Sequence, residues 1–139
     1  MILAVLRRED ENVRDWLMRS VDELGRDPRE RLIGLFDVYA GWIESEGFRG
    51  CLFIKAACEF GDPEDKCKAV SIEAKRLVRQ AIRELVVETA APAPDVLADQ
   101  LNLLVQGAIV QAQVAEDLSA IWLAKSIATA LIDDALCAG

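Results

Sequence analysis

The stretch LADQLNLLVQGAIVQAQV, residues 97–114, decides the fold class of this chain. At about 100° per residue, four of its polar side chains fall on one stripe of a helix, while most of the remaining circumference is apolar. That stripe contains Asp99, Asn102, Gln106 and Gln113. A helix that is apolar on two sides has to be buried on both. We therefore expect this helix to pack within its own protomer and against a second chain.

The rest of the chain is predicted to form further helices separated by short breaks. Asp27-Pro28 and Asp62-Pro63 each place a capping residue directly before a proline, which suits the first position of a helix. No segment has a convincing strand pattern. The expected helices cover residues 2–24, 28 to about 46, 50–60, the stretch beyond residues 61–65 to about 88, 94 to about 114, and about 117–136. The sequence thus predicts one all-α domain, a bundle of about six helices over residues 1–139.

Hydrophobic residues make up 53% of the 139 residues, above the usual range of about 45–50% for soluble domains. Large exposed apolar patches are rare on monomers. The excess is therefore expected to lie in an interface or to line a cavity.

Charge and segment composition exclude several classes of partner. The net charge of −8 disfavours binding of DNA by this chain alone, because basic residues supply most of that affinity. No apolar run approaches the length of a bilayer span, and no secretory segment is present. We expect a cytoplasmic protein with reduced cysteines and no membrane partner.

An enzyme is not expected, and neither is a metal or a cofactor. The chain has no histidine, the commonest general base and metal ligand. Cys51, Cys58 and Cys67 lack the spacing of zinc sites. Cys51 and Cys58 share a helical face, where they are either small buried hydrophobes or a redox-sensing pair. No phosphate loop, serine elbow or carboxylate constellation is found.

The last two helices are expected to build a homodimer. Two helices with apolar faces on opposite sides, doubled by symmetry, would form an intermolecular four-helix bundle. The predicted interface consists of Leu103, Gly107, Val110, Ile121, Ala124 and Ala128.

A ligand site is predicted between the first, second, long and penultimate of these helices. Aromatic side chains there would line an apolar pocket or pack as ordinary core. Gln100 and Gln111 lie away from the polar stripe, so they would serve a pocket or the dimer interface. The predicted lining consists of Trp16, Phe36, Tyr39, Trp42, Leu77, Ala81, Gln100, Leu104 and Gln111. Basic residues follow the outer face of the helix ending near residue 88, as a solvated surface or a regulatory patch.

Three segments in fixed order carry a family resemblance. They are GFRGCLFIKAACEFGDPED at 47–65, KAVSIEAKRLVRQAIREL at 68–85 and LADQLNLLVQGAIVQAQV at 97–114. Their order and spacing resemble the C-terminal part of TetR-family transcriptional regulators, over nearly the whole chain. Within that resemblance, residues 1–10 look like the start of the first helix after the family's DNA-binding domain.

The resemblance implies an effector-binding and dimerisation domain of a regulator, a repressor, whose DNA binding is controlled by a small apolar molecule. It also implies that a helix-turn-helix domain would precede residue 1 and is missing, so DNA would be contacted only through that domain. The alternative is a stand-alone helical homodimeric interaction protein with no DNA role.

Overall fold

The computed structural model describes residues 2–46, 48, 50–59 and 66–138. In this part of the chain it contains helices and no strand. The helices are α1 (Ile2–Asp22), α2 (Pro28–Ile43), α3 (Leu52–Glu59), α4 (Lys66–Glu88), α5 (Pro94–Ala115) and α6 (Ala120–Ala138). The prediction of an all-α domain with about six helices is confirmed.

Helix α2 starts at the predicted Asp27-Pro28 start signal, with one difference. Asp27 is the N-cap residue in an extended conformation and Pro28 occupies the first helical turn. The Asp27 side chain makes no capping hydrogen bond; its backbone carbonyl accepts the Arg31 amide at 2.9 Å. The second predicted helix start signal, Asp62-Pro63, lies outside the described residues. The side chain of Cys58 also lies outside them.

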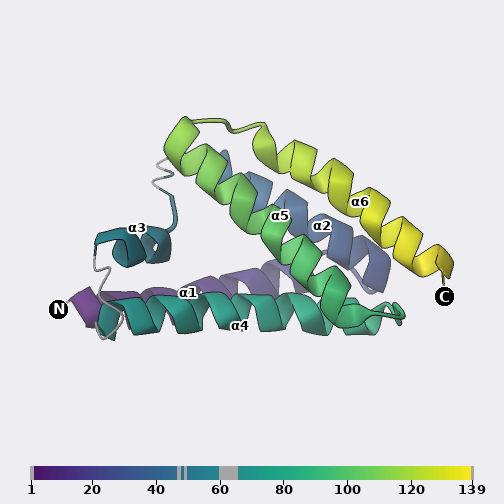
Figure 1. The fold of residues 1–139 in the computed structure, drawn as a ribbon, viewed down its shortest axis with the longest axis horizontal. Helices are drawn as coiled ribbons and strands as arrows, with labels where there is room; N and C mark the ends of the chain where they lie inside the picture. Colours follow the sequence, from purple (N-terminus) through teal and green to yellow (C-terminus); the bar gives the residue numbers. More distant parts are fainter. Residues whose placement is uncertain (1, 47, 49, 60–65, 139) are drawn as a thin grey trace.

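The helices are arranged around α2. Helices α1 and α4 lie side by side along the base of Figure 1, and α5 and α6 form an antiparallel pair above them. Helix α2 contacts α1, α4, α5 and α6, and the short α3 packs on α4 and α1 at the N-terminal end. The two termini lie at opposite ends of the molecule (Figure 1).

Helix α2 contributes several fully buried side chains to the core. Phe36 is fully buried, together with Leu32 and Leu35 on the same helix. Ile82 of α4 and Ile132 of α6 are also fully buried in this cluster. The apolar stripes of three helices thus meet at α2, and the burial of each large side chain stabilises the fold by about 1.5–3 kcal/mol.

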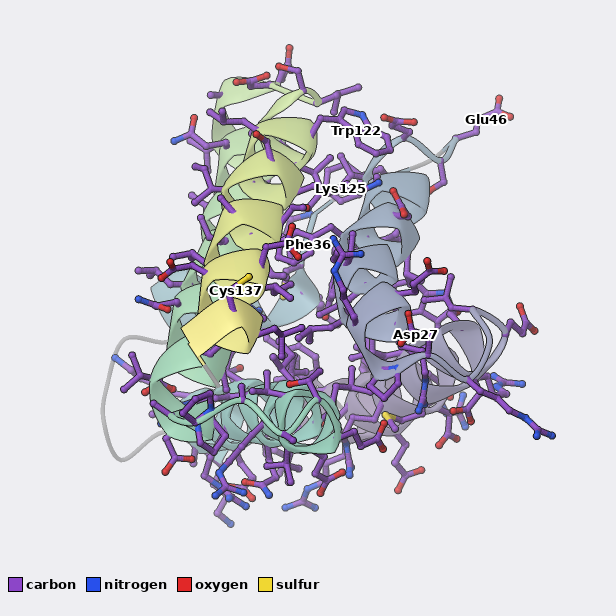
Figure 2. All side chains as sticks on the ribbon, turned by 90° about the vertical axis from the view of Figure 1, so that its right-hand side faces the viewer. Asp27, Phe36, Glu46, Trp122, Lys125 and Cys137 are labelled. Carbon is purple, nitrogen blue, oxygen red and sulfur yellow. The ribbon has the colours of Figure 1, made fainter. Side chains whose placement is uncertain are left out.

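Polar contacts hold α6 along the outer side of α2, as Figure 2 shows from the α6 side. The Trp122 indole N–H donates to Glu44 at 2.7 Å, and the Lys125 ammonium pairs with Asp37 at 2.7 Å. At the other end of α2 the pair is Arg29–Asp133, at 2.8 Å. These groups are at least partly exposed, so each contributes little by itself.

The basic face of α4 is used for ion pairs. Arg79 pairs with Asp99 and Arg83 pairs with Asp95, both on α5. Both pairs are about half-exposed. This surface joins α4 to α5, and its arginine charges are largely neutralised.

Candidate functional site

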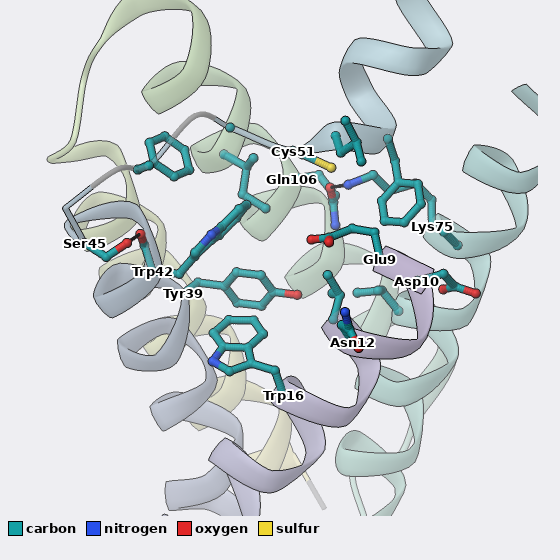
Figure 3. A pocket seen from close by; sticks show the side chains of 18 of the residues that line it. Glu9, Asp10, Asn12, Trp16, Tyr39, Trp42, Ser45, Cys51, Lys75 and Gln106 are labelled. Carbon is teal, nitrogen blue, oxygen red and sulfur yellow. Dashed lines mark hydrogen bonds between the residues drawn. The ribbon is translucent and has the colours of Figure 1, made fainter. Parts of the chain in front are cut away.

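A cavity of about 510 Å³ lies at the end of the bundle where α1, α2, α3, α4 and α5 meet. Its floor and sides come from helices (Figure 3), and the described residues Ser45, Glu46, Phe48, Gly50 and Cys51 between α2 and α3 complete the wall. The lining residues are Glu9, Asp10, Asn12, Val13, Trp16, Tyr39, Trp42, Ser45, Glu46, Phe48, Gly50, Cys51, Leu52, Phe53, Ala74, Lys75, Val78, Gln106 and Ile109. This volume falls within the range of about 300–1,000 Å³ that small-molecule sites occupy.

Four aromatic rings form one side of the cavity. Trp16 of α1 meets Tyr39 edge to face at a centroid distance of 5.8 Å, and Trp42 lies 6.3 Å from each of them. Phe48 packs edge to face on Trp42 at 5.0 Å. The spacing of three residues between Tyr39 and Trp42 puts both on one face of α2. The cluster provides rigid apolar surface with polar edges at Tyr39 and the indoles.

Polar groups approach from the opposite side. The Lys75 ammonium of α4 donates to the Gln106 carboxamide oxygen of α5 at 2.5 Å. Asp10 is held by Arg14 through two hydrogen bonds of 2.9 and 3.1 Å. The Glu9 carboxylate points into the cavity, toward the space between Tyr39 and Gln106 (Figure 3).

The wall between α2 and α3 depends on a glycine. Gly50 has φ +89°, a left-handed conformation that side-chain-bearing residues rarely adopt. An added Cβ at this position would lie 2.3 Å from the Gln113 side chain. That close approach lets the Gln113 side-chain oxygen accept the Cys51 amide at 2.9 Å. The wall is thereby fixed to α5.

Tyr39 is the cavity residue with a perturbed ionisation. Its side chain is buried, and burial raises the pKa of Tyr39 well above its ordinary value, with a smaller contribution from Cys51. Removal from water disfavours the charged phenolate. The hydroxyl, which points toward the middle of the cavity in Figure 3, is therefore a neutral hydrogen-bonding group.

Of the predicted ligand residues, the structure brings Trp16, Tyr39 and Trp42 to the cavity. Phe36 is one turn away on α2, fully buried in the filled core. Leu77 and Ala81 do not line the cavity, because α4 presents Ala74 and Val78 there instead.

The glutamine assignment also needs correction. Gln100 and Gln111 are exposed, and Leu104 is half-buried outside the lining. The amide that reaches the cavity belongs to Gln106, a member of the polar stripe. Helix α4 covers part of this stripe through Lys75 and Arg79.

Several cavity residues were missed by sequence reasoning. Glu9, Asn12 and Lys75 are polar residues on amphipathic helices, where solvent exposure is the ordinary expectation. Phe48 and Phe53 belong to the quoted segment 47–65, whose density of aromatic residues was the available signal.

The predicted dimer residues fall into two groups. Leu103, Gly107 and Val110 are exposed on α5, with 73% of Leu103 accessible. Ile121, Ala124 and Ala128 are instead buried inside the protomer. They form the inner stripe of α6, which packs on α2 and α5, so they are not available to a partner chain.

The outward faces of α5 and α6 carry other apolar residues. The exposed ones on or next to these helices are Val96, Leu103, Val110, Val114, Leu118, Trp122, Leu123 and Ile127. On α5 the spacing between Val96, Leu103, Val110 and Val114 keeps them on one face. We call Val96, Leu103, Gly107, Val110, Val114, Leu123 and Ile127 the outer stripe.

Two further properties concern the described part of the chain. None of its helices has the length and hydropathy needed to cross a membrane. None of its His, Cys, Asp and Glu side chains form a group of three that could hold a metal ion.

Comparison with known proteins identifies the fold. The crystal structure of a TetR-family transcriptional regulator from Streptomyces coelicolor superimposes with a TM-score of 0.79 at 19% sequence identity, covering 99% of this chain and 70% of that one. A search of curated proteins found no match. Residues 28–128 match the family described as "tetracyclin repressor-like, C-terminal domain". The chain therefore belongs to the TetR family of transcriptional regulators, as a C-terminal domain of that family.

Proposed function

We propose that the chain is the effector-binding and dimerisation domain of a TetR-like repressor whose DNA binding is controlled by a small molecule. The observation that carries this proposal is the cavity of about 510 Å³, lined by five aromatic rings and a few polar side chains. Small-molecule sites have this composition, with apolar walls and few orienting groups. DNA would be contacted by a separate N-terminal domain of the regulator, consistent with the net charge of −8 here.

The outer stripe supports the homodimer. Val114 is 75% exposed and Leu103 is 73% exposed, and apolar residues of this size on one helix face are typical of interfaces. Gly107 lies between them with no heavy atom within 4 Å of an added Cβ. A glycine in such a place permits close approach of a second helix.

Effector binding is tested by a compound screen that reads melting temperature and tryptophan fluorescence together. A ligand at a hundredfold excess over its Kd should raise the melting temperature by about 5–10 °C. Trp16 and Trp42 line the cavity, whereas Trp122 lies on α6. The fluorescence response should therefore survive Trp122→Phe and diminish in Trp42→Phe. A diverse library with no stabilising compound would contradict effector binding and favour a stand-alone interaction protein.

Dimerisation is tested at two exposed glycines. Gly107→Arg introduces a charge into the outer stripe, while Gly41→Arg introduces the same charge on α2, where an added Cβ also meets nothing within 4 Å. Burying an unpaired charge is costly, so Gly107→Arg should raise the dimer Kd by about a hundredfold or more. Light scattering should show folded monomers for Gly107→Arg and dimers for Gly41→Arg. Dimers in both variants would place the interface elsewhere.

A further inference from the structure

Acidic residues outnumber basic ones among the described residues that line the cavity. Three acidic residues line it, Glu9, Asp10 and Glu46, and the one lysine or arginine among its described lining residues is Lys75. Glu46 is exposed and its carboxylate points away from the helices (Figure 2). Asp10 is already paired with Arg14, at 2.9 Å, and Lys75 donates to Gln106. Among the described lining residues, Glu9 is therefore the carboxylate left to meet a ligand.

Glu9 is the carboxylate placed to meet a ligand. It is half-buried on α1 and directed into the cavity (Figure 3). Within the described part of the chain, its carboxylate makes no hydrogen bond and no ion pair. A carboxylate that is partly removed from water is stabilised by an opposite charge brought next to it.

The aromatic cluster favours the same kind of ligand. Trp16, Tyr39, Trp42 and Phe48 all line the cavity, with neighbouring centroids 5.0–6.3 Å apart. The negative face of an aromatic ring attracts a cation within about 6 Å of its centroid, and desolvation strengthens the attraction. Tryptophan, the best ring for this interaction, contributes two of the four rings.

We infer that the cavity takes an organic cation, an amine or quaternary ammonium group on an apolar or aromatic body, with Glu9 as its counter-ion. This inference rests on the proposed function, that the cavity holds a small-molecule effector. The ammonium group lies between the Glu9 carboxylate and the aromatic rings, and the apolar body fills the space toward Phe53 and Val78. A neutral ligand would leave Glu9 unpaired, and an anion would be repelled by the Glu9 carboxylate.

The experiment compares three probes that share one ring system and differ in charge. They are naphthylmethyl-trimethylammonium, naphthylmethanol and naphthylacetate, titrated calorimetrically into the 139-residue protein. The cation is expected to bind about tenfold more tightly than the alcohol, and the anion more weakly than both.

Two variants on α1, each of which removes one carboxylate charge, test whether Glu9 causes the preference for the cation. Glu9→Gln keeps the shape of the side chain and removes the charge, so it should lower affinity for the cation about tenfold and change affinity for the alcohol by less than about twofold. Glu11→Gln makes the same change in net charge at an exposed position that does not line the cavity. It should leave all three affinities within about twofold of the parent protein.

The outcomes separate this inference from the function on which it rests. Equal or tighter binding of the alcohol overturns the cation preference but leaves effector binding intact. Tightest binding of naphthylacetate overturns it in favour of Lys75 as anchor. Loss of the preference in both Glu9→Gln and Glu11→Gln removes Glu9 from its assigned role. If none of the three probes binds, the test of the cation preference is the charge of the compounds found in the wider screen. Neutral or anionic ligands overturn the inference. A screen that finds no ligand overturns the proposed function as well.

Discussion

The middle and the C-terminal end of α2 place aromatic side chains in different surroundings. Phe36, in the middle, is fully buried in the hydrophobic core, which includes aliphatic residues of α2, α4 and α6. Around Tyr39 and Trp42, one and two turns later, about 510 Å³ stays open. Helix α2 contacts the long helices α1, α4, α5 and α6, whereas part of the cavity wall comes from the eight-residue α3 and from described residues that precede it. An aromatic stripe therefore does not by itself distinguish core from cavity.

The largest expected effect contrasts two phenylalanines. Phe36→Ala leaves a cavity at a fully buried position in the hydrophobic core. It should lower the free energy of unfolding by about 3–5 kcal/mol. Phe48→Ala removes a half-buried ring beside an existing cavity, so its cost should be about 1–2 kcal/mol. Urea unfolding followed by circular dichroism measures both. Equal losses would mean that the cavity end is packed as tightly as the core.

Gly50→Ala tests the wall of the cavity end. The new Cβ would meet Gln113 at 2.3 Å at a position with φ +89°, so the variant should lose about 1–3 kcal/mol of stability. Gly41→Ala is the control, because it is an exposed helical site with free space. There alanine should stabilise by about 0.5–1 kcal/mol. Thermal melts that move in the same direction for both variants would show that Gly50 is not under the stated constraint.

A smaller effect concerns the pH dependence at Tyr39. Because its pKa is raised in the folded state, the unfolded chain loses this proton first. The stability associated with Tyr39 is complete below about pH 10 and is lost as pH rises through the folded pKa, by up to about 1.4 kcal/mol per pH unit.

Tyr39→Phe should remove this slope while leaving the slopes of lysines in place. Unfolding free energies at about pH 9 and about pH 11 provide the comparison. The chain has one tyrosine, so phenolate absorbance reports Tyr39 alone. Titration of the folded protein with an ordinary tyrosine pKa would show that the ring is accessible to water through the cavity.

The smallest effect is expected on the exposed face between α4 and α5. Arg79→Ala breaks the pair with Asp99, in which both groups are about half-exposed. Such pairs contribute roughly 0–1 kcal/mol. The melting temperature should change little, and less still in high salt. A loss comparable with that of Phe36→Ala would mean that ion pairs hold α4 and α5 together.

Much of the fold followed from local patterns. Asp27-Pro28 and Pro94 preset the backbone at the starts of α2 and α5, and both helices begin at the prolines. Periodicity identified α4, whose buried residues include Ala74, Val78 and Leu85. These features depend on residues that are close together in the sequence, so they can be predicted from the sequence alone.

The orientation of α6 did not follow from sequence. Ala124 and Ala128 share one face, Leu123 and Ile127 share another, and both faces are apolar. The structure turns the first face inward and leaves Leu123 65% exposed. Only the shape of the neighbouring helices decides between two such faces. The same limit applies to the cavity. Its aromatic residues recur at helical spacing, so sequence reasoning could propose them. Glu9 and the other polar lining residues reach the cavity only because of how the helices pack.

One helix separates the cavity from the outer stripe. Gln106 and Ile109 of α5 line the cavity, and Gly107 and Val110 are exposed. If occupancy of one side alters the geometry of α5, the two binding events share a coupling free energy, and the coupling is reciprocal. A ligand that tightened the dimer tenfold would itself bind tenfold more tightly to the dimer. The apparent effector affinity would then depend on protein concentration, so that the sensitivity of the sensor would be set partly by how much of the protein the cell makes.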